Sequence, residues 1–209
     1  MNKTQEGDLE GPELAEILER KAAIRQAIRE RRYILGEGTY AKLSSQISRK
    51  VLDLPEFTAA HRICSYVHKD STREVRTTAI LQAVLDTPDK ELVVPISRTD
   101  RIDLDLSIVR DLADLQPATF NVPEPASQDL VEPESLDLVI MPCLAVDSTG
   151  NRLGYGKGYF DVLLARIRPE VPAMALAFEL QLVPSIPPTP RDRKATIIVT
   201  EKRVIRCEP

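Results

Sequence analysis

The sequence predicts a three-layer α/β fold built as one domain. Short apolar segments of strand length alternate along the chain with longer segments whose apolar residues recur at helical spacing. The chain has no internal repeat, and no stretch is rich enough in glycine and serine to link two separate domains. We therefore expect residues 1–209 to form a single domain, with the polar residues 1–11 loosely attached at its start.

The amino-acid composition indicates which kinds of molecule the protein binds. The 209 residues are enough to bury a sizeable core, and the 43% hydrophobic and 29% charged content is that of a soluble globular protein. The net charge of −4 argues against a general nucleic-acid-binding function. No apolar run approaches the length of a membrane span, and the start of the chain lacks the apolar region of a signal peptide. The expected partners are small molecules, without nucleic acid or membrane.

The cysteines and histidines are too few and too scattered for a structural metal site. Cys64, Cys143 and Cys207 lie far apart and include no Cys-x-x-Cys pair, and the only histidines are His61 and His68. A zinc site or a disulfide framework is therefore unexpected. Separated cysteines in odd number fit a reducing compartment, so the expected location is cytoplasmic.

The elements follow from local start signals and apolar spacing. Pro12 suits the first position of a helix, and Pro55 ends a later one. The expected helices cover residues 12–33, 39–52, 71–85 and 159–167. The expected strands cover residues 62–67, 91–96, 104–109, 136–141, 173–178, 196–200 and 203–206. Two proline-rich stretches, residues 116–134 and 183–190, are expected to be loops.

Two cations fall within the apolar stripe of the first predicted helix. On a helical wheel Lys21 and Arg25 share the face that carries Leu14, Ile17, Leu18, Ile24 and Ile28. As like charges four residues apart, they repel each other by roughly 0.2–0.5 kcal/mol. Either both long side chains extend to the rim of the stripe, or the two cations share a bound anion such as a nucleotide phosphate.

The most distinctive stretch is residues 150–161, which hold four of the chain's eight glycines. A predicted strand precedes it and a predicted helix follows it, so backbone N–H groups and the helix N-terminus are expected to face a bound anion, most naturally phosphate. Arg152 and Lys157 would add positive charge. The stretch lacks the Gly-Lys-Ser/Thr ending of a P-loop and the glycine spacing of a dinucleotide fingerprint. The alternative is an ordinary surface loop with two solvated cations.

A longer signature includes this stretch and two segments before it: Met141-Pro142, Val146-Asp147 and residues 150–161. It resembles the signature of the 5-formyltetrahydrofolate cyclo-ligase family, also called 5,10-methenyltetrahydrofolate synthetases, and the resemblance extends from about Lys21 to Ile205. The resemblance implies an α/β/α open sheet of the sugar-phosphate isomerase and CoA transferase type. Residues 154–158 would lie at the carboxyl end of a strand, where such sheets bind ligands. It also implies Mg²⁺ as cofactor, with ATP and 5-formyltetrahydrofolate as substrates. We expect a monomer or weak homodimer.

The resemblance implies specific site residues. The expected catalytic residues are Lys21, Arg25, Arg152 and Lys157. Of these, Lys21 and Arg25 match the family's Lys-x-x-x-Arg, which contacts ATP. The expected ATP-binding residues are Lys21, Arg25, Arg152, Leu153, Gly154, Tyr155, Gly156, Lys157, Gly158, Tyr159 and Phe160. The expected folate-binding residues are Val67, Glu74, Phe120, Tyr155, Gly156, Lys157, Gly158 and Tyr159. Asp161 and Asp192 match the two carboxylates that hold Mg²⁺ in the family.

Three of these assignments have a plainer alternative. Residues 74–77 resemble the family's Glu-Val-Asp-Thr, whose glutamate binds the pterin of the folate, but Glu74 also suits the first turn of a helix, where the helix dipole favours an acid. Residues 120–125 resemble a family segment that covers the substrate, or form a proline-rich surface connection. Asp161 holds the metal ion, or is a carboxylate at the start of a helix.

The chain departs from the family pattern at three positions. Arg76 stands where the family has Asp, Arg191 where it has His, and Ala195 where it has a second Asp. These departures motivate an alternative function, a regulatory protein that binds nucleotide or folate without turnover. A further alternative is a metal-independent sugar-phosphate isomerase of similar fold, which would need Glu74 as a general base near the phosphate loop.

The reaction implied by the resemblance begins with an amide oxygen that is a poor leaving group. Transfer of the γ-phosphoryl group of ATP to the formyl oxygen turns this oxygen into a good leaving group. N10 then attacks the activated carbon, the ring closes and phosphate departs. Phosphoryl transfer requires positioning and charge neutralisation more than a protein nucleophile. The sequence shows no Ser/His/Asp or Cys/His constellation, so covalent catalysis by the protein is not expected.

Overall fold

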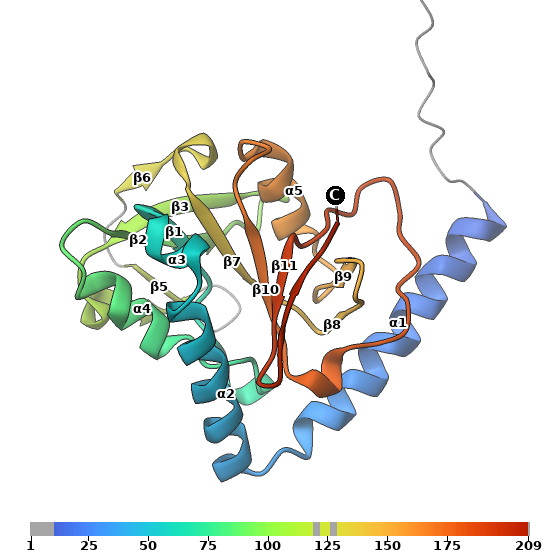
Figure 1. The fold of residues 1–209 in the computed structure, drawn as a ribbon. Helices are drawn as coiled ribbons and strands as arrows, with labels where there is room; N and C mark the ends of the chain where they lie inside the picture. Colours follow the sequence, from blue (N-terminus) through green and yellow to red (C-terminus); the bar gives the residue numbers. More distant parts are fainter. Residues whose placement is uncertain (1–10, 119–121, 126–128, 209) are drawn as a thin grey trace, which may run out of the picture.

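A computed structural model describes residues 11–118, 122–125 and 129–208 of the chain. Its centre is an eight-stranded sheet with the order β12-β11-β10-β7-β1-β2-β3-β6, and helices cover both faces (Figure 1). The strands from β11 to β2 pair in parallel, whereas β12, β3 and β6 pair antiparallel at the edges. The structure confirms the predicted three-layer α/β/α fold.

Most sheet strands lie in the stretches for which the sequence predicts strands. They are β1 (Arg62–Ser65), β2 (Glu91–Ser97), β3 (Leu104–Val109), β6 (Leu130–Val131), β7 (Leu138–Pro142), β10 (Ala173–Leu176), β11 (Ile197–Val199) and β12 (Val204–Arg206). Strand β1 ends two residues earlier than predicted. This places Val67 in the loop that follows β1 and not in the strand itself.

The loop predicted over residues 116–134 contains strands, so that prediction is wrong in part. Strands β4 (Leu115–Pro117) and β5 (Pro123–Pro125) pair antiparallel, with Gln116 opposite Glu124, and β6 pairs with the edge of the main sheet. The prolines conceal the hairpin in the sequence. They are tolerated because a strand at an edge can leave positions without a ladder hydrogen bond.

The helices are α1 (Pro12–Tyr33), α2 (Glu37–Leu52), α3 (Pro55–Ala59), α4 (Thr78–Leu85) and α5 (Tyr159–Arg166). Helix α1 has the predicted bounds. Pro55 does not simply end α2: it is the first residue of α3, where a proline loses no helical hydrogen bond.

The helix predicted to open within residues 71–77 begins only at Thr78. A single 3₁₀ turn, η1 (Asp70–Thr72), comes first, and Arg73 follows it with a φ of 53°. This left-handed conformation interrupts the helical winding. Glu74 therefore precedes α4, and its interpretation as a first-turn acid is wrong.

Side chains of the central strands alternate between two cores. On one face Ile63 of β1 and Ile140 of β7 pack with α2, α3 and α4. On the other face Cys64 and Val139 pack with Leu163 of α5. Because the parallel strands are buried on both faces, they are almost continuously apolar in sequence.

Helix α1 lies along the outside of the molecule, where it contacts β8, η1 and η5 (Glu179–Gln181) (Figure 1). Its buried side chains are those of Lys21, Ile28 and Arg32. Over the first turns the predicted apolar stripe is only partly buried: Leu14 and Ile17 are half-buried, whereas Leu18 is 51% exposed and lines the cavity described below. Figure 1 shows this end of the helix at the edge of the molecule, away from the sheet.

The structure also shows the state of the cysteines and the character of the helices. Cys64 and Cys143 are buried and Cys207 is partly exposed, and all three are free thiols. Within the described ranges, no helix combines the length and the apolar character that crossing a bilayer requires.

Candidate active site

A cavity of about 940 Å³ opens at the carboxyl ends of the parallel strands. Val67 follows β1, Ser97 ends β2 and Pro142 ends β7, and all three residues line the cavity. Open α/β sheets bind their ligands at this edge. Helix α1, the loop of residues 69–74, the glycine-rich stretch and residues 189–193 form much of the remaining wall, so segments far apart in sequence meet around one space.

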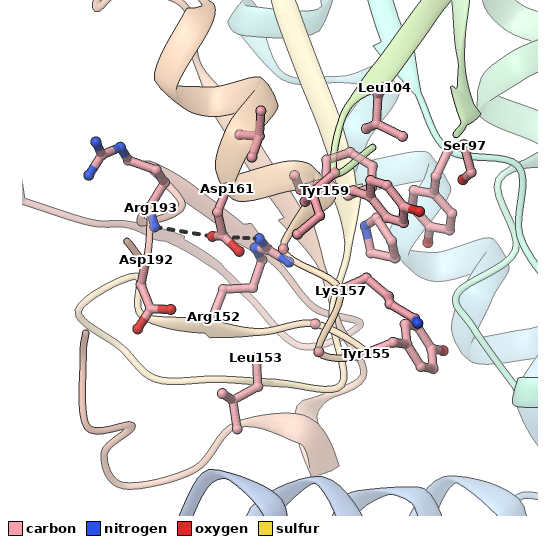
Figure 2. A pocket seen from close by; sticks show the side chains of 18 of the residues that line it. Ser97, Leu104, Arg152, Leu153, Tyr155, Lys157, Tyr159, Asp161, Asp192 and Arg193 are labelled. Carbon is pink, nitrogen blue, oxygen red and sulfur yellow. Dashed lines mark hydrogen bonds and ion pairs between the residues drawn. The ribbon is translucent and has the colours of Figure 1, made fainter. Parts of the chain in front are cut away.

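The cavity gathers the site residues predicted from the sequence. Phe120 is the exception, because it lies outside the described residues. Figure 2 labels some of the others, among them Arg152, Lys157, Asp161 and Asp192. The predicted residues that line the cavity are Lys21, Arg25, Val67, Glu74, Arg152, Leu153, Gly154, Tyr155, Gly156, Lys157, Gly158, Tyr159, Phe160, Asp161 and Asp192.

The glycine-rich stretch reaches the cavity from a small hairpin, in which β8 (Ala145–Val146) pairs with β9 (Arg152–Leu153). The predicted strand before the turn is β7, but this hairpin, which was not predicted, stands between β7 and the turn. Gly156 and Gly158 adopt φ of 98° and 76°, which residues with a side chain rarely adopt. The turn then leads into α5, whose N-terminus opens on the cavity.

Asp147 holds the tip of the hairpin together. It is 2% exposed, and its carboxylate accepts hydrogen bonds from the backbone N–H groups of Thr149, Asn151 and Ile186, and from the side chains of Thr149 and Asn151. Gly150 lies between these donors with a φ of 90°. These hydrogen bonds fix the backbone position at the start of the glycine-rich stretch.

Lys21 and Arg25 each contact a different part of the cavity wall. The ammonium group of Lys21, which is 3% exposed, forms an ion pair with Asp192. Nε of Arg25 donates to the carbonyl oxygen of Gly154 at 2.9 Å. The interpretation that both cations extend to the rim is wrong for Lys21, because it is buried and paired. Mutual repulsion between two unpartnered cations does not describe the site either.

Arg152 and Asp161 form a second cation–carboxylate pair, marked by a dashed line in Figure 2. Nη2 of Arg152 lies 3.1 Å from Oδ1 of Asp161, and this oxygen also accepts the backbone N–H of Arg193 at 3.1 Å. The guanidinium lies 5.8 Å from the centre of the Phe160 ring. Nε of Arg152 is buried and has no hydrogen-bond partner among the described residues.

The two predicted metal ligands, Asp161 and Asp192, line the same cavity but are already paired with cations. In the described part of the chain, hydrogen bonds reach Oδ1 of Asp161 and Oδ2 of Asp192, which leaves each carboxylate a second oxygen. No cluster of three or more His, Cys, Asp or Glu side chains suited to a metal ion occurs within the described ranges. The donor set therefore fits an ion that takes most of its ligands from water and phosphate, as Mg²⁺ does.

A buried carboxylate lies in the cavity wall close to Tyr155 of the glycine turn. Glu74 is 6% exposed, and its Oε2 accepts the backbone N–H of Lys69 at 2.8 Å. Burial raises the pKa of Glu74, although the Tyr155 hydroxyl, the Lys69 N–H and the cation of Arg32 oppose that rise. Burial also raises the pKa of Tyr155 to about 12. An acid with a raised pKa beside polar groups in a cavity is typical of a ligand-binding site.

Arg32 is absent from the residues singled out in the sequence, although the structure buries it beside the cavity. It is 2% exposed and donates to the Tyr155 hydroxyl at 2.8 Å. A signal for it exists in the sequence. Lys21, Ile28 and Arg32 follow the helical spacing of one face, so the stripe of α1 continues to its last turn.

The three departures from the family pattern have different structural settings. Arg76 pairs with Glu37 and Asp70 and lies 4.5 Å over the Tyr40 ring, away from the cavity lining. Arg191 lines the cavity. Ala195 is buried at the hairpin, where its backbone N–H donates to the Gly150 carbonyl oxygen at 2.8 Å.

Comparison with known proteins identifies relatives of the chain. The chain matches the model of the 5-formyltetrahydrofolate cyclo-ligase family over residues 17–201. The mitochondrial 5-formyltetrahydrofolate cyclo-ligase of Arabidopsis thaliana is 30% identical to it over 94% of this chain and 79% of the relative. The 5-formyltetrahydrofolate cyclo-ligase of Mus musculus is 28% identical over 87% of this chain and 93% of the relative. The NMR structure of Aquifex aeolicus 5,10-methenyltetrahydrofolate synthetase superposes with a TM-score of 0.79 at 30% identity, covering 90% of this chain and 93% of that one.

Proposed function

Because the chain belongs to the 5-formyltetrahydrofolate cyclo-ligase family, we propose that it uses ATP and Mg²⁺ to close 5-formyltetrahydrofolate to 5,10-methenyltetrahydrofolate, with release of ADP and phosphate. Family membership makes it an enzyme, a ligase of folate one-carbon metabolism. The observation that carries the finer proposal is that one cavity gathers both cations suited to a nucleotide and a buried carboxylate suited to a second ligand. Its volume of about 940 Å³ lies near the upper end for small-molecule sites, as two substrates require.

The phosphates of ATP are proposed to bind between α1 and the glycine turn. Lys21 and Arg25 come from α1, Arg152 from β9 and Lys157 from the turn, so the four cations approach from separate elements. Backbone N–H groups of residues 153–160 and the N-terminus of α5 would add donors to the phosphate oxygens. Such a set holds the γ-phosphoryl group in place and neutralises its charge during transfer.

The pterin ring of the folate is proposed to bind at the other end of the cavity. Glu74 is an acceptor for the N–H donors of the pterin, and Val67 supplies apolar contact beside it. Tyr155 and Tyr159 offer aromatic surface from the glycine turn, and Phe120 is proposed to cover the substrate from the segment outside the described residues. The formyl group would then lie between the two ends, next to the phosphates.

Mg²⁺ is proposed to be held by Asp161 and Asp192. Each carboxylate keeps one oxygen outside its present ion pair, and Mg²⁺ commonly binds through one or two carboxylates together with water and substrate phosphates. When bound, the ion would neutralise phosphate charge alongside the cations.

The chain's own contribution to the reaction is positioning. Lys21, Arg25, Arg152 and Lys157 hold the γ-phosphoryl group against the formyl oxygen, so that this oxygen attacks phosphorus and ADP leaves. N10 then attacks the formyl carbon and loses its proton. The C–O bond breaks with its electron pair on oxygen, and phosphate departs as the ring closes. The walls of the cavity keep bulk water away from the phosphorylated intermediate.

A coupled assay of ADP release tests the proposal. ADP is expected only when 5-formyltetrahydrofolate is present, in step with the methenyl product. Equal ADP release without folate would identify a plain ATPase. Affinity for ATP or folate without any ADP would support the alternative, a regulatory binding protein that has lost turnover.

We also propose that the protein is cytoplasmic and acts as a monomer or weak homodimer. Three free thiols suit a reducing cytoplasm, and a net charge of −4 does not favour nucleic acid or an anionic membrane as partner. The cavity is built from elements of one chain. A monomer or weak homodimer is therefore sufficient for activity, which sedimentation at the assay concentration would test.

A further inference from the structure

The buried guanidinium of Arg32 connects three segments around the folate end of the cavity. Nη1 donates to the Cys143 carbonyl oxygen at 3.3 Å, and Nη2 donates to the Tyr155 hydroxyl at 2.8 Å and to the carbonyl oxygen of Thr72. Thr72 and Tyr155 line the cavity, whereas Arg32 is not among the lining residues. Arg32 therefore acts on the cavity from behind its wall.

Packing alone does not explain why an arginine is buried at position 32, because burying its guanidinium costs free energy. Its Nε is buried without a hydrogen-bond partner among the described residues. A buried donor without a partner is destabilising, and a methionine would occupy similar space without that donor. The contacts through Nη1 and Nη2 are what an arginine adds at this position.

Arg32 also provides a positive charge beside the carboxylate proposed to bind the pterin. Glu74 follows the Thr72 carbonyl by two residues, and Arg32 favours its ionised form in surroundings whose burial opposes ionisation. The Tyr155 hydroxyl accepts a hydrogen bond from Arg32 and, like Arg32, favours the ionised form of Glu74. The three side chains therefore influence one another electrostatically.

We propose that Arg32 is a positioning residue for the folate substrate, one that fixes Tyr155 and the loop carrying Glu74 in the geometry that receives the pterin ring. This inference rests on the proposed function. It assigns different roles to the middle and to the last turn of α1. Lys21 faces the nucleotide end, and Arg32 lies eleven residues later, roughly 16 Å along the helix at 1.5 Å per residue.

The test compares Arg32→Met with Arg31→Met, which removes an exposed arginine from the same turn of the same helix. Binding of 5-formyltetrahydrofolate is measured at equilibrium without ATP, and KM is measured for both substrates. In Arg32→Met the folate Kd and KM should each rise about tenfold or more, the effect of losing a charged hydrogen-bond network, while the KM for ATP stays within about twofold. Arg32→Lys restores the charge without the planar fork, so it should recover only part of the folate affinity. Arg31→Met should behave as the wild type.

Equal increases in the KM values for folate and ATP in Arg32→Met would overturn the inference. An unchanged folate Kd together with a lower melting temperature would also overturn it. Either result would mean that Arg32 has a structural role only. If Arg32→Met does not fold, Tyr155→Phe removes only the hydroxyl that Arg32 contacts. Its effect on folate binding should be less than additive with Arg32→Lys, since the two residues act through one network. Full additivity would contradict the inference. A wild type that fails to bind folate contradicts the proposed function, whereas normal wild-type binding that Arg32→Met leaves intact contradicts only the role of Arg32.

Discussion

Lys21 and Asp192, 171 positions apart in the chain, form an ion pair in the wall of the cavity. The Lys21 side chain is 4% exposed and that of Asp192 is 27% exposed, so the cation is buried and the anion borders the open space. The pair ties α1 to the segment before β11. Lys21 is therefore a structural tie as well as a proposed phosphate ligand, and a substitution there has two separate consequences.

Lys21→Met should raise the KM for ATP by about tenfold or more, because a charge-assisted contact to phosphate contributes roughly 1.5–3 kcal/mol and 1.4 kcal/mol is a factor of ten. The folate KM should change less. Without ligand, the variant should melt at a lower temperature than the wild type, because Asp192 loses its cation. ATP titration of the steady-state rate and thermal melts measure the two effects, with Arg20→Met, an exposed position on the same helix, as the control. An unchanged ATP KM would show that Lys21 is structural only.

Arg25→Ala should also raise the KM for ATP, and Arg25→Lys should not fully restore it. Nε of Arg25 donates to the Gly154 carbonyl oxygen at 2.9 Å, which leaves the outer edge of the guanidinium for a ligand. A lysine ammonium lacks the planar fork that makes both contacts at once. Steady-state ATP titration of both variants is the measurement. Equal KM values for Arg25→Lys and the wild type would mean that charge alone is required.

Asp161→Asn and Asp192→Asn should each lower turnover, and raising the Mg²⁺ concentration should partly restore it. Each substitution removes one carboxylate from a site that takes its other ligands from water and phosphate, so affinity for the ion falls without the site being lost. The measurement is the rate as a function of Mg²⁺, with Asp89→Asn at an exposed position as the control. Wild-type activity and Mg²⁺ dependence in Asp192→Asn would exclude Asp192 as a metal ligand.

Asp147 should make stability depend on acid pH. Burial opposes its ionisation, but hydrogen bonds from Thr149, Asn151 and Ile186 hold the pKa of Asp147 below its usual value. With a depressed folded pKa, this stabilisation is fully present above the unfolded pKa of about 3.9 and is lost as pH falls through the folded pKa. Asp147→Asn should therefore reduce the free energy of unfolding by about 1–3 kcal/mol at neutral pH, and by less below about pH 4. Denaturant titrations at both pH values measure this, and a difference that does not vary with pH would contradict it.

Much of the fold could be predicted because the signals are local. Strands such as β7, buried on both faces, appear as continuous apolar runs, and Pro12 marks the start of α1. The hairpin of β4 and β5 could not be predicted, since its prolines indicate a loop. The late start of α4 depends on the left-handed Arg73, a conformation that few non-glycine residues adopt and that the sequence does not indicate.

The site was predictable where one segment carries the pattern and not where distant segments meet. Residues 154–158 are recognisable by their glycines alone. The pairing of Lys21 with Asp192, and of Arg152 with Asp161, depends on side-chain geometry that composition and spacing do not contain. Arg32 was missed because a cation near the end of an exposed helix is usually solvated, whereas here the segments around Thr72 and Cys143 enclose it.

Oxygen-18 in the formyl group tests the central claim, phosphorylation of the formyl oxygen by ATP, most directly. With 5-formyltetrahydrofolate labelled at that oxygen, the enzyme, ATP and Mg²⁺ should yield inorganic phosphate that carries the label, one labelled phosphate for each ADP and each methenyl product, because the C–O bond breaks on the carbon side. Mass spectrometry of the phosphate reads this out. Unlabelled phosphate formed together with methenyl product would contradict the account, because ATP would then be hydrolysed by water and the formyl oxygen would leave by another route.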